Sequence, residues 1–453
     1  MKKVHFIAVG GSIMHQLAIA LHKKGYEVSG SDDEIYDPAL SNLKKNNLYS
    51  GDGWDTDKIT TDLDAVILGM HARNGNPELD QAKALGLSIF SFPEYIFEES
   101  KHKKRVVVGG SHGKTTITSM IMHVLNKQEK DFDYLVGAKV PGFESSVKMS
   151  DAPLIVCEGD EYPASALKKV PKFFFYHPHI SVLSGIAWDH MNVFPTYENY
   201  VEQFQKFIEG LATGSTLIYN GKDGELSQLV KEYGSHLKAI PFAIPEHKVE
   251  NGKTQVVLNG YAEFISVFGD HNLMDLQAAA LVCQKLGISS QNFLTAIKDF
   301  EGAAQRLEKI YEDEKTTVFR DFAHAPSKVE ASLNAVKEQF PDRKLTAVAE
   351  LHTYSSLNKD FLPQYEGKMD AADNVAVFYD PHAVKIKKLP FISPEQIKEG
   401  FKRQNMEVIS TKEELLDFIS QQDSDDANLL IMSSGSLGGT TNEDILAHWG
   451  NNK

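Results

Sequence analysis

The chain has 453 residues and a formal net charge of −15, from 47 Lys and Arg against 62 Asp and Glu. With 42% hydrophobic and 24% charged residues it is an ordinary globular chain, long enough for about three domains. The acidic balance argues against non-specific attraction to nucleic acid or to an anionic membrane, so any phosphate ligand has to be held by a local site.

The N-terminus and the cysteines indicate a cytoplasmic protein. The apolar run within residues 1–11 is broken by glycines and has no cleavage site after it, and no stretch reaches the ~20 apolar residues that span a bilayer. Cys157 and Cys283 form no CxxC pair, so both are interpreted as core residues of a protein in a reducing compartment. We expect a monomer or a weak homodimer with no nucleic-acid or membrane partner.

Strand and helix patterns alternate along the chain, which is typical of parallel sheets covered by helices on both faces. The elements predicted in the first block are a strand and turn at 4–11, a helix at 14–25, and strands at 26–32, 64–70 and 87–92. The charged segment 98–104 is interpreted as a linker that ends a domain of residues 1–100.

The second block, residues 101–308, opens with a buried strand that feeds through glycines into a long helix at 105–127. Further strands are predicted at 154–162 and 180–190, and the aromatic segment 168–179 between them is interpreted as core and turn. The third block, residues 309–453, repeats the alternation. Its predicted strands are 316–324, 345–351, 374–380 and 428–435.

The strongest local signal is the sequence GGSHGKTT at 109–116, between a strand and a helix. Such a glycine turn points backbone N–H groups and the positive end of the helix dipole at phosphate oxygens. Lys114 would reach the β- and γ-phosphates, and the Thr115 hydroxyl would bind Mg²⁺ while Thr116 begins the helix. The full pattern requires glycine where the chain has Val108, so a plain glycine turn with a solvated lysine is the alternative.

Two polar clusters follow predicted strands, at the sheet edge where parallel sheets place their ligands. Glu158, Asp160 and Glu161 form one cluster, and Asp189 with His190 forms the other. One carboxylate and one imidazole could complete the shell of a hard metal ion that also keeps phosphate and water oxygens as ligands. For each cluster alone, solvated or packed loop residues are the alternative.

The glycine turn of the first block, residues 8–14, departs from the dinucleotide-binding pattern because Ala8 and Ile13 occupy glycine positions. Asp32 ends the next predicted strand, about 20 residues further on, where an acidic side chain could accept from a ribose hydroxyl. NAD is the rival ligand. A second nucleotide loop at Lys114 favours a substrate in the first domain and ATP in the second.

Together these residues resemble the Mur ligase family, ATP-dependent amide-forming enzymes of peptidoglycan assembly. The segments similar to family motifs are Gly110–Thr116, Glu158–Glu161, the pair Asp189 and His190, and residues 269–279, 304–308 and 321–326. The resemblance covers all three blocks. It implies a Rossmann-like N-terminal domain, a central P-loop ATPase domain, and a C-terminal Rossmann-like domain that closes over ATP and the amine.

The resemblance also implies a set of site residues. Those for ATP are Gly110, Ser111, His112, Gly113, Lys114, Thr115, Thr116, Asn272, Arg306, Asp321 and His324. Those for the UDP-sugar in residues 1–100 are Gly10, Gly11, Ser12, Ile13, Met14, Ser31 and Asp32. Those implied as catalytic are Lys114, Glu158 and His190, with Thr115, Glu158 and His190 as ligands of Mg²⁺ at two sites and Asp160 and Glu161 orienting the amine.

Five residues depart from the family pattern. Gly185 and Ala187 replace side chains that could orient nucleotide or metal, Asp275 stands where Asn is usual, and Gln305 and Arg320 alter two further positions. A degenerate ligase that binds its ligands without turnover is therefore an alternative.

Two branches of the family begin from UDP-N-acetylmuramate, one adding L-alanine and one recycling the tripeptide L-alanyl-γ-D-glutamyl-meso-diaminopimelate. The features similar to the recycling branch are Ile13 with Met14, Val140–Ser145 and Met432–Gly439. Residues 352–355 resemble the alanine-adding branch, although Ser356 stands in place of the Arg that would follow. We expect ligation of the tripeptide through an acyl phosphate, with L-alanine as the alternative amine and a folate-type glutamate ligase as a more distant one.

Overall fold

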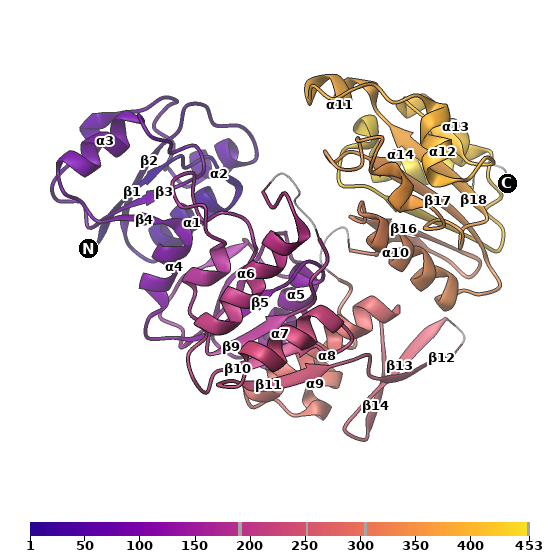
Figure 1. Ribbon diagram of the computed structural model, residues 1–453, viewed down its shortest axis with the longest axis horizontal. Helices are drawn as coiled ribbons and strands as arrows, with labels where there is room; N and C mark the ends of the chain where they lie inside the picture. The colour runs from indigo at the N-terminus through magenta and orange to yellow at the C-terminus, as the bar shows by residue number, and fades with distance from the viewer. Residues whose placement is uncertain (189–192, 251, 303–305, 451–453) are drawn as a thin grey trace. The chain divides into compact units, whose positions relative to one another are not determined.

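The computed structural model describes residues 1–188, 193–250, 252–302 and 306–450 (Figure 1). They form two compact units. The first comprises Met1–Ala243 and Met274–Ile297, and the second comprises Ile244–Leu273 and the described residues from Lys298 onward. None of the described helices combines the length and the apolar character that crossing a membrane requires. Asp189 and His190 lie outside the described residues, and so does Gln305.

The first unit begins with a four-stranded parallel sheet in the order β2-β1-β3-β4. Its elements are β1 Lys3–Ile7, α1 Ser12–Lys23, β2 Glu27–Ser31, α2 Ala39–Lys45, β3 Ala65–Leu68, α3 Pro77–Ala84, β4 Ile89–Ser91 and α4 Phe92–Ser100. Strand residues alternate between the faces, so Phe6 packs with Leu17 of α1, while Ile7 and Val66 pack with Leu79 of α3. The strands and the first helix predicted in this block are confirmed.

Segment 98–104, which was interpreted as a linker, consists of the end of a helix and a short turn. Helix α4 runs to Ser100 and the next strand begins at Lys104, so only a short turn separates them. Lys103 is buried in this turn, where its Nζ lies 2.5 Å from Asp133 Oδ2. The guanidinium of Arg105 is also buried and donates to the carbonyl of Ser100 at 2.8 Å. The turn is thus held in place by two buried cations, whose partners are Asp133 and the Ser100 carbonyl.

The second sheet of this unit has seven strands in the order β11-β10-β9-β5-β8-β6-β7, all parallel except β7. Its elements are β5 Lys104–Gly109, α5 Lys114–Lys127, β6 Asp133–Leu135, β7 Val147–Lys148, β8 Leu154–Glu158, β9 Ile180–Leu183, α6 Tyr197–Gly210, β10 Thr216–Asn220, α7 Gly224–Tyr233, β11 Lys238–Phe242, α8 Asp270–Lys285 and α9 Ser290–Ile297.

Strands β5, β8 and β9 are apolar along most of their length because helices cover both faces of the sheet. Helices α6 and α7 cover one face (Figure 1), and α5 contacts β5, β8 and α9. The aromatic segment 168–179 contributes the buried Phe173 and Tyr176, which confirms its interpretation as core. Both cysteines are buried and free, as expected.

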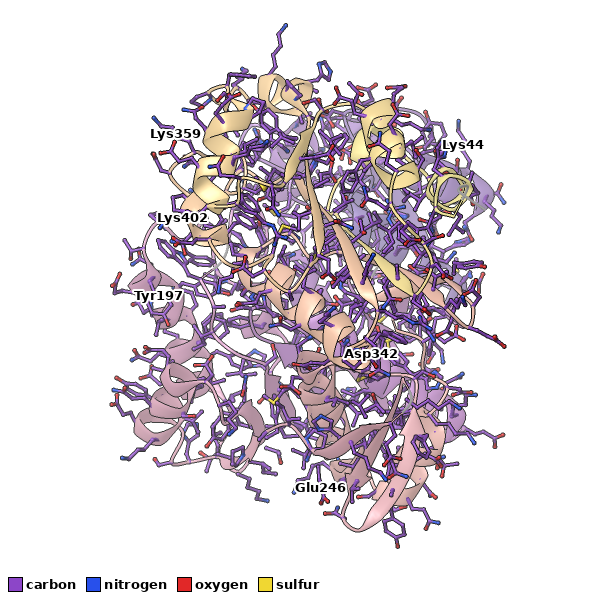
Figure 2. All side chains as sticks on the ribbon, turned by 90° about the vertical axis from the view of Figure 1, so that its right-hand side faces the viewer. Lys44, Tyr197, Glu246, Asp342, Lys359 and Lys402 are labelled. Atoms are coloured by element: carbon purple, nitrogen blue, oxygen red, sulfur yellow. The ribbon has the colours of Figure 1, made fainter. Side chains whose placement is uncertain are left out.

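Helix α8 crosses the division between the units at Leu273. The second unit starts before it with a small antiparallel sheet of β12 Glu246–Glu250, β13 Lys253–Leu258 and β14 Tyr261–Ile265. We did not predict this sheet, because β12 is exposed along its whole length (Figure 2 labels Glu246). The pair Asn259 and Gly260 between β13 and β14 has positive φ at both residues, the signature of a tight hairpin turn.

The main sheet of the second unit has the order β15-β16-β20-β17-β18-β19 and is parallel except for β15. Its elements are β15 Glu308–Glu312, β16 Thr316–Asp321, α10 Pro326–Gln339, β17 Lys344–Leu351, β18 Asn374–Tyr379, α11 Pro381–Ile386, α12 Pro394–Phe401, β19 Glu407–Ile409, α13 Lys412–Ser420, β20 Ala427–Met432 and α14 Asn442–His448. Helices α10 and α12 cover one face, and α13 and α14 cover the other. The four strands predicted in this block are confirmed, and the predicted division between residues 308 and 309 falls within β15.

Candidate active site

The loop between β5 and α5 has the backbone geometry of a phosphate-binding turn. Gly110 and Gly113 adopt φ of 117° and 77°, which L side chains rarely adopt. A Cβ on Gly110 would lie 2.2 Å from Ser184 Oγ, and one on Gly113 would lie 2.2 Å from Asp275 Oδ1. Both positions therefore require glycine for the φ angle and for space, and the loop ends at the N-terminus of a 14-residue helix.

Lys114, the first residue of α5, forms an ion pair with a buried carboxylate. Its Nζ donates to the Gly110 carbonyl at 2.6 Å and to Glu161 Oε2 at 2.9 Å. Burial lowers the pKa of Lys114, but the charges of Glu161, Glu158 and Asp160 outweigh it and raise the pKa, so the ammonium stays charged.

Tyr200 of α6 connects this carboxylate to the loop. Its hydroxyl donates to Glu161 Oε1 at 3.1 Å and lies 2.8 Å from Ser111 Oγ. Glu161 is fully buried, so it cannot contact an incoming amine in this structure. In this structure the Glu161 carboxylate positions Lys114, and the amine-orienting role expected for it stays a prediction. Nothing in the local sequence distinguished Tyr200, because its partners are distant in the chain.

Two of the residues implied as Mg²⁺ ligands meet beside the loop. Thr115 Oγ1 lies 3.0 Å from both carboxylate oxygens of Glu158, and the Gly137 N–H donates to Glu158 Oε2 at 2.8 Å. Burial raises the pKa of Glu158, while the Gly137 hydrogen bond and the Lys114 charge oppose that rise. A hydroxyl and a carboxylate are hard oxygen donors, so this pair fits Mg²⁺.

Asp160 is the more accessible carboxylate of its cluster. Its Oδ2 accepts from Lys172 Nζ at 2.9 Å and its Oδ1 from the Tyr162 N–H at 3.1 Å. Its side chain keeps a third of its surface exposed. Of the two residues expected to orient the amine, Asp160 is therefore the more accessible.

The departures Gly185 and Ala187 support the phosphate loop through their backbones. The Gly185 carbonyl accepts from the Ser111 N–H at 3.0 Å, and the Ala187 N–H donates to Ser111 Oγ at 2.8 Å. Gly185 has φ of 148°, and a Cβ there would lie 3.2 Å from Asp223 Oδ2. The same Asp223 oxygen accepts from the Ile186 N–H at 2.6 Å. Glycine at 185 is thus required by the loop geometry.

Asp275 of α8 faces the last glycine of the loop. Asp275 is 8% exposed, and no residue in the described ranges makes a hydrogen bond or ion pair with its side chain. Burial raises the pKa of Asp275 to about 8. The carboxyl is therefore neutral at pH 7, which gives it the charge of the Asn usual at this position.

The remaining residues implied at ATP belong to the second unit. The Asn272 amide donates to the Phe268 carbonyl at 3.1 Å, and the Arg306 guanidinium lies 4.6 Å from the ring centroid of Phe322. Asp321 is buried and accepts from the N–H groups of Leu307 and Phe322 and from the Ser332 hydroxyl. A ribose hydroxyl would have to compete with these donors, so the ribose contact implied for Asp321 stays a prediction.

His324 and Arg320 also form hydrogen bonds with groups of the protein. His324 Nδ1 lies 2.8 Å from the Phe322 carbonyl, next to the C-terminal end of β16. Arg320 Nη1 donates to Asn442 Oδ1 at 2.6 Å, which ties β16 to the first residue of α14. The departure at Arg320 therefore has a structural partner within its own unit.

In the first sheet, Asp32 stabilises the glycine turn. The Gly10 N–H donates to Asp32 Oδ2 at 2.8 Å, and a Cβ on Gly10 would lie 2.9 Å from that oxygen. Ala8, where the dinucleotide pattern has glycine, is held at φ of 68°. With 1% of Asp32 exposed, the ribose contact expected for it would require the turn to rearrange.

The other residues implied at the UDP-sugar differ in accessibility. Ser31 is buried and accepts from Lys58 Nζ at 3.2 Å, and Met14 is buried in the core. Ser12 is exposed at the first position of α1, with Gly11 before it as the N-cap. The start of α1 is thus the part of the predicted set that a phosphate could reach directly.

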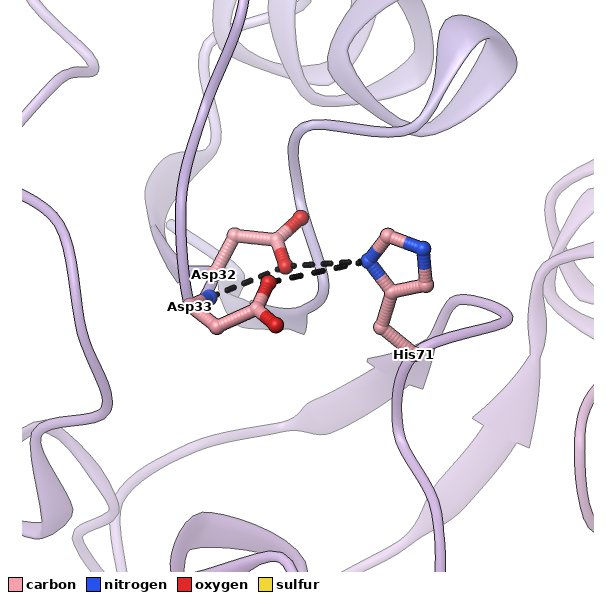
Figure 3. A group of neighbouring side chains, drawn as sticks. All are labelled: Asp32, Asp33 and His71. Carbon is pink, nitrogen blue, oxygen red and sulfur yellow. Dashed lines mark hydrogen bonds and ion pairs between the residues drawn. The ribbon is translucent and has the colours of Figure 1, made fainter. Parts of the chain in front are cut away.

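Asp32, Asp33 and His71 form a group of possible metal ligands in the first sheet (Figure 3). His71 Nδ1 lies 3.3 Å from Asp32 Oδ1 and 3.8 Å from Asp33 Oδ1. The Asp33 N–H also donates to Asp32 Oδ1 at 3.0 Å. These hydrogen bonds account for the arrangement without a metal ion. No other group of three such residues occurs within the described ranges, which omit 189–192.

Family models match most of the chain. Three family models match: "Mur ligase family, catalytic domain" at residues 3–104, "Mur ligase middle domain" at 108–283, and "Mur ligase, glutamate ligase domain" at 305–435. The UDP-N-acetylmuramate–L-alanine ligase of Caldicellulosiruptor bescii is 30% identical over 414 residues, which are 88% of each chain.

Solved structures of the same architecture include both branches considered above. A murein peptide ligase, the UDP-N-acetylmuramate:L-alanyl-γ-D-glutamyl-meso-diaminopimelate ligase from Neisseria meningitides, is 26% identical with a TM-score of 0.60. The match covers 66% of this chain and 98% of that one. The UDP-N-acetylmuramate-alanine ligase from Thermotoga maritima is 20% identical with a TM-score of 0.69, covering 96% of each chain.

Proposed function

This chain belongs to the Mur ligase family of ATP-dependent, ADP-forming amide ligases, and we propose that it joins UDP-N-acetylmuramate to the tripeptide L-alanyl-γ-D-glutamyl-meso-diaminopimelate. The competing amine is L-alanine, the amino acid in the name of the C. bescii ligase. Which of the two is the substrate depends on what the second unit offers to the free carboxylates of the amine.

The segment that follows β17 carries this proposal. Residues 352–356 contain no Arg or Lys, and Ser356 is fully buried. The Thr353 N–H donates to Ser356 Oγ at 2.9 Å, and the Ser356 N–H donates to Thr353 Oγ1 at 3.1 Å. L-alanine is small, so an enzyme recognises it mainly through its carboxylate. Arginine is the usual partner of a carboxylate in proteins. The turn itself therefore supplies neither Arg nor Lys to the carboxylate of a free amino acid.

In the proposed reaction, the γ-phosphoryl group of ATP is transferred to the lactyl carboxylate of UDP-N-acetylmuramate. The resulting acyl phosphate is attacked by the amine, and a tetrahedral intermediate collapses to the amide and phosphate. The backbone N–H groups of the β5–α5 loop and the Lys114 ammonium would neutralise charge on the phosphates. Glu161 and Tyr200 keep this ammonium oriented, so little reorganisation is needed when ATP binds.

Thr115 and Glu158 would hold Mg²⁺, together with His190 as the sequence implies. When bound, the ion supplies charge neutralisation on the phosphoryl oxygens. Asp160 would orient the incoming amine, since its carboxylate is more accessible than that of Glu161.

The test is phosphate release from ATP and Mg²⁺ with UDP-N-acetylmuramate, comparing the tripeptide with L-alanine and identifying products by mass. Turnover with the tripeptide alone supports the proposal. Turnover with L-alanine alone assigns the chain to the biosynthetic branch, and nucleotide binding without turnover of either amine favours the degenerate alternative. A Lys114→Ala variant should lose turnover, and normal activity in it would reject the phosphate-loop mechanism.

A further inference from the structure

A cluster of exposed apolar and basic side chains lies at one edge of the main sheet of the second unit. Tyr354, Ile386 and Phe391 are 60%, 67% and 66% exposed, although large apolar groups of this kind are usually covered. Between and beside them are three lysines. We define the edge patch as Tyr354, Lys385, Ile386, Lys387, Lys388 and Phe391.

Parallel strand pairing places all of these residues at the same edge. Strands β17 and β18 are parallel neighbours, with Leu351 of the first opposite Tyr379 of the second. Tyr354 follows the end of β17 by three residues, and α11 and the segment to Phe391 follow the end of β18. This is the carboxyl edge, where open parallel sheets bind their ligands.

Contacts between the two segments make the patch continuous. Lys387 Nζ lies 5.0 Å from the ring centroid of Tyr354, a cation–π contact that joins the α11 segment to the segment after β17. The ring of Phe391 packs edge-on against Tyr379, with centroids 6.2 Å apart. The Ile392 N–H donates to the Tyr379 hydroxyl at 3.0 Å. Contacts with Tyr379 and between Lys387 and Tyr354 thus hold the exposed side chains in place.

Among the residues that the structure describes, the lysines of the patch have no acidic partner. Residues 381–391 contain three lysines and no acidic residue, and none of the three forms an ion pair with any residue in the described part of the chain. Other lysines of this unit do pair, such as Lys402 with Glu366 and Lys412 with Asp444. In a chain of net charge −15, three unpaired cations beside exposed aromatic rings indicate a ligand that is acidic and partly apolar.

We propose that the edge patch binds the distal part of a peptide substrate, with the lysines contacting its free carboxylates and Tyr354 and Phe391 covering its aliphatic chain. This inference rests on the proposed function and names the residues that would distinguish a peptide from an amino acid. The tripeptide carries free carboxylates on its glutamyl and diaminopimelyl residues and an aliphatic chain between them, whereas L-alanine has one carboxylate and a methyl group. The patch therefore favours the peptide over the amino acid.

The test measures kcat and KM for the tripeptide in the full-length protein and in a K385Q/K387Q/K388Q variant. We expect KM to rise about tenfold with kcat retained, because three exposed charge pairs are lost without a change at the reacting groups. The matched control is K222Q/K231Q/K238Q, which makes the same charge change at exposed lysines of the first unit and should leave KM unchanged.

The complementary change is made in the substrate, as a tripeptide amidated at its glutamyl and diaminopimelyl carboxylates. Its KM should be raised with the wild-type protein and should not rise further in the triple variant. Tyr354→Ala is the second variant, and it should raise KM for the tripeptide through lost apolar contact.

The outcomes separate this inference from the proposed function. If the wild-type protein ligates the tripeptide but the triple variant keeps its KM within twofold of wild type, the edge patch is not the peptide site and the function stands. If the wild-type protein ligates only L-alanine, both the function and the inference are overturned.

Discussion

Replacing Asp275 with Asn should stabilise the protein, and the gain should grow with pH. The Asp275 carboxyl is buried against Gly113, and no hydrogen bond or ion pair compensates it within the described residues. Asn has nearly the same shape and is neutral at every pH. The substitution therefore removes the cost of keeping a proton on a buried acid and changes little else.

The size of the effect follows from the pKa of the group. Burial raises the pKa of Asp275 from 3.8 to about 8. Between these values the unfolded chain has lost the proton while the folded protein retains it, so the free energy of unfolding falls as pH rises. The slope is about 1.4 kcal/mol per pH unit, and it ends above pH ~8, where both states are ionised. The advantage of Asn over Asp should thus grow by roughly 2–3 kcal/mol from pH 6 to pH 8.

The assay is thermal unfolding of the wild-type and Asp275→Asn proteins at pH 6, 7 and 8. For a unit of this size the gap in Tm should widen by about 5 °C over this range. Asp360→Asn is the matched control, because Asp360 is exposed and the same substitution there should leave the Tm gap constant. A gap for Asp275→Asn that does not change with pH would refute the reasoning, since it would mean that the carboxyl is ionised in the folded protein.

Three further substitutions test the site and its supports. Glu161→Gln leaves the Lys114 ammonium in its buried position without its main counter-charge, so urea denaturation should show a loss of about 3 kcal/mol, and a loss below ~1 kcal/mol would mean that water reaches the ammonium. Gly113→Ala should weaken Mg·ADP binding by about tenfold or more in calorimetric titration, because φ of 77° and the Asp275 carboxyl both oppose a methyl group. Ala8→Gly should raise the free energy of unfolding by ~0.5–1 kcal/mol because it relieves φ of 68°, whereas the control Ala331→Gly inside α10 should lower it by about 1 kcal/mol. Equal signs for the two glycine substitutions would contradict the assignment of strain to Ala8.

The sequence was sufficient to predict the local elements of the phosphate site. The run of apolar residues in β5, the glycines after it and the helix that begins at Lys114 are all encoded within about 25 consecutive residues. The same holds for the confirmed strands of the three parallel sheets, because alternating strand and helix periods are properties of short segments. The antiparallel sheet was missed since β12 has no buried face, although Asn259 and Gly260 carried a turn signal.

The tertiary structure decided which side chains are available for chemistry. Glu161 and Asp321 belong to motifs that imply contacts with substrates, yet both are buried and bonded to protein groups. Tyr200 reaches the phosphate loop although 89 residues separate it from Ser111. A motif specifies residue types and local backbone, whereas burial depends on which distant elements pack together. The sequence by itself therefore determined the phosphate loop and the family, and only the packing of α6 and α8 against that loop decided how its lysine is held and why its last glycine cannot change.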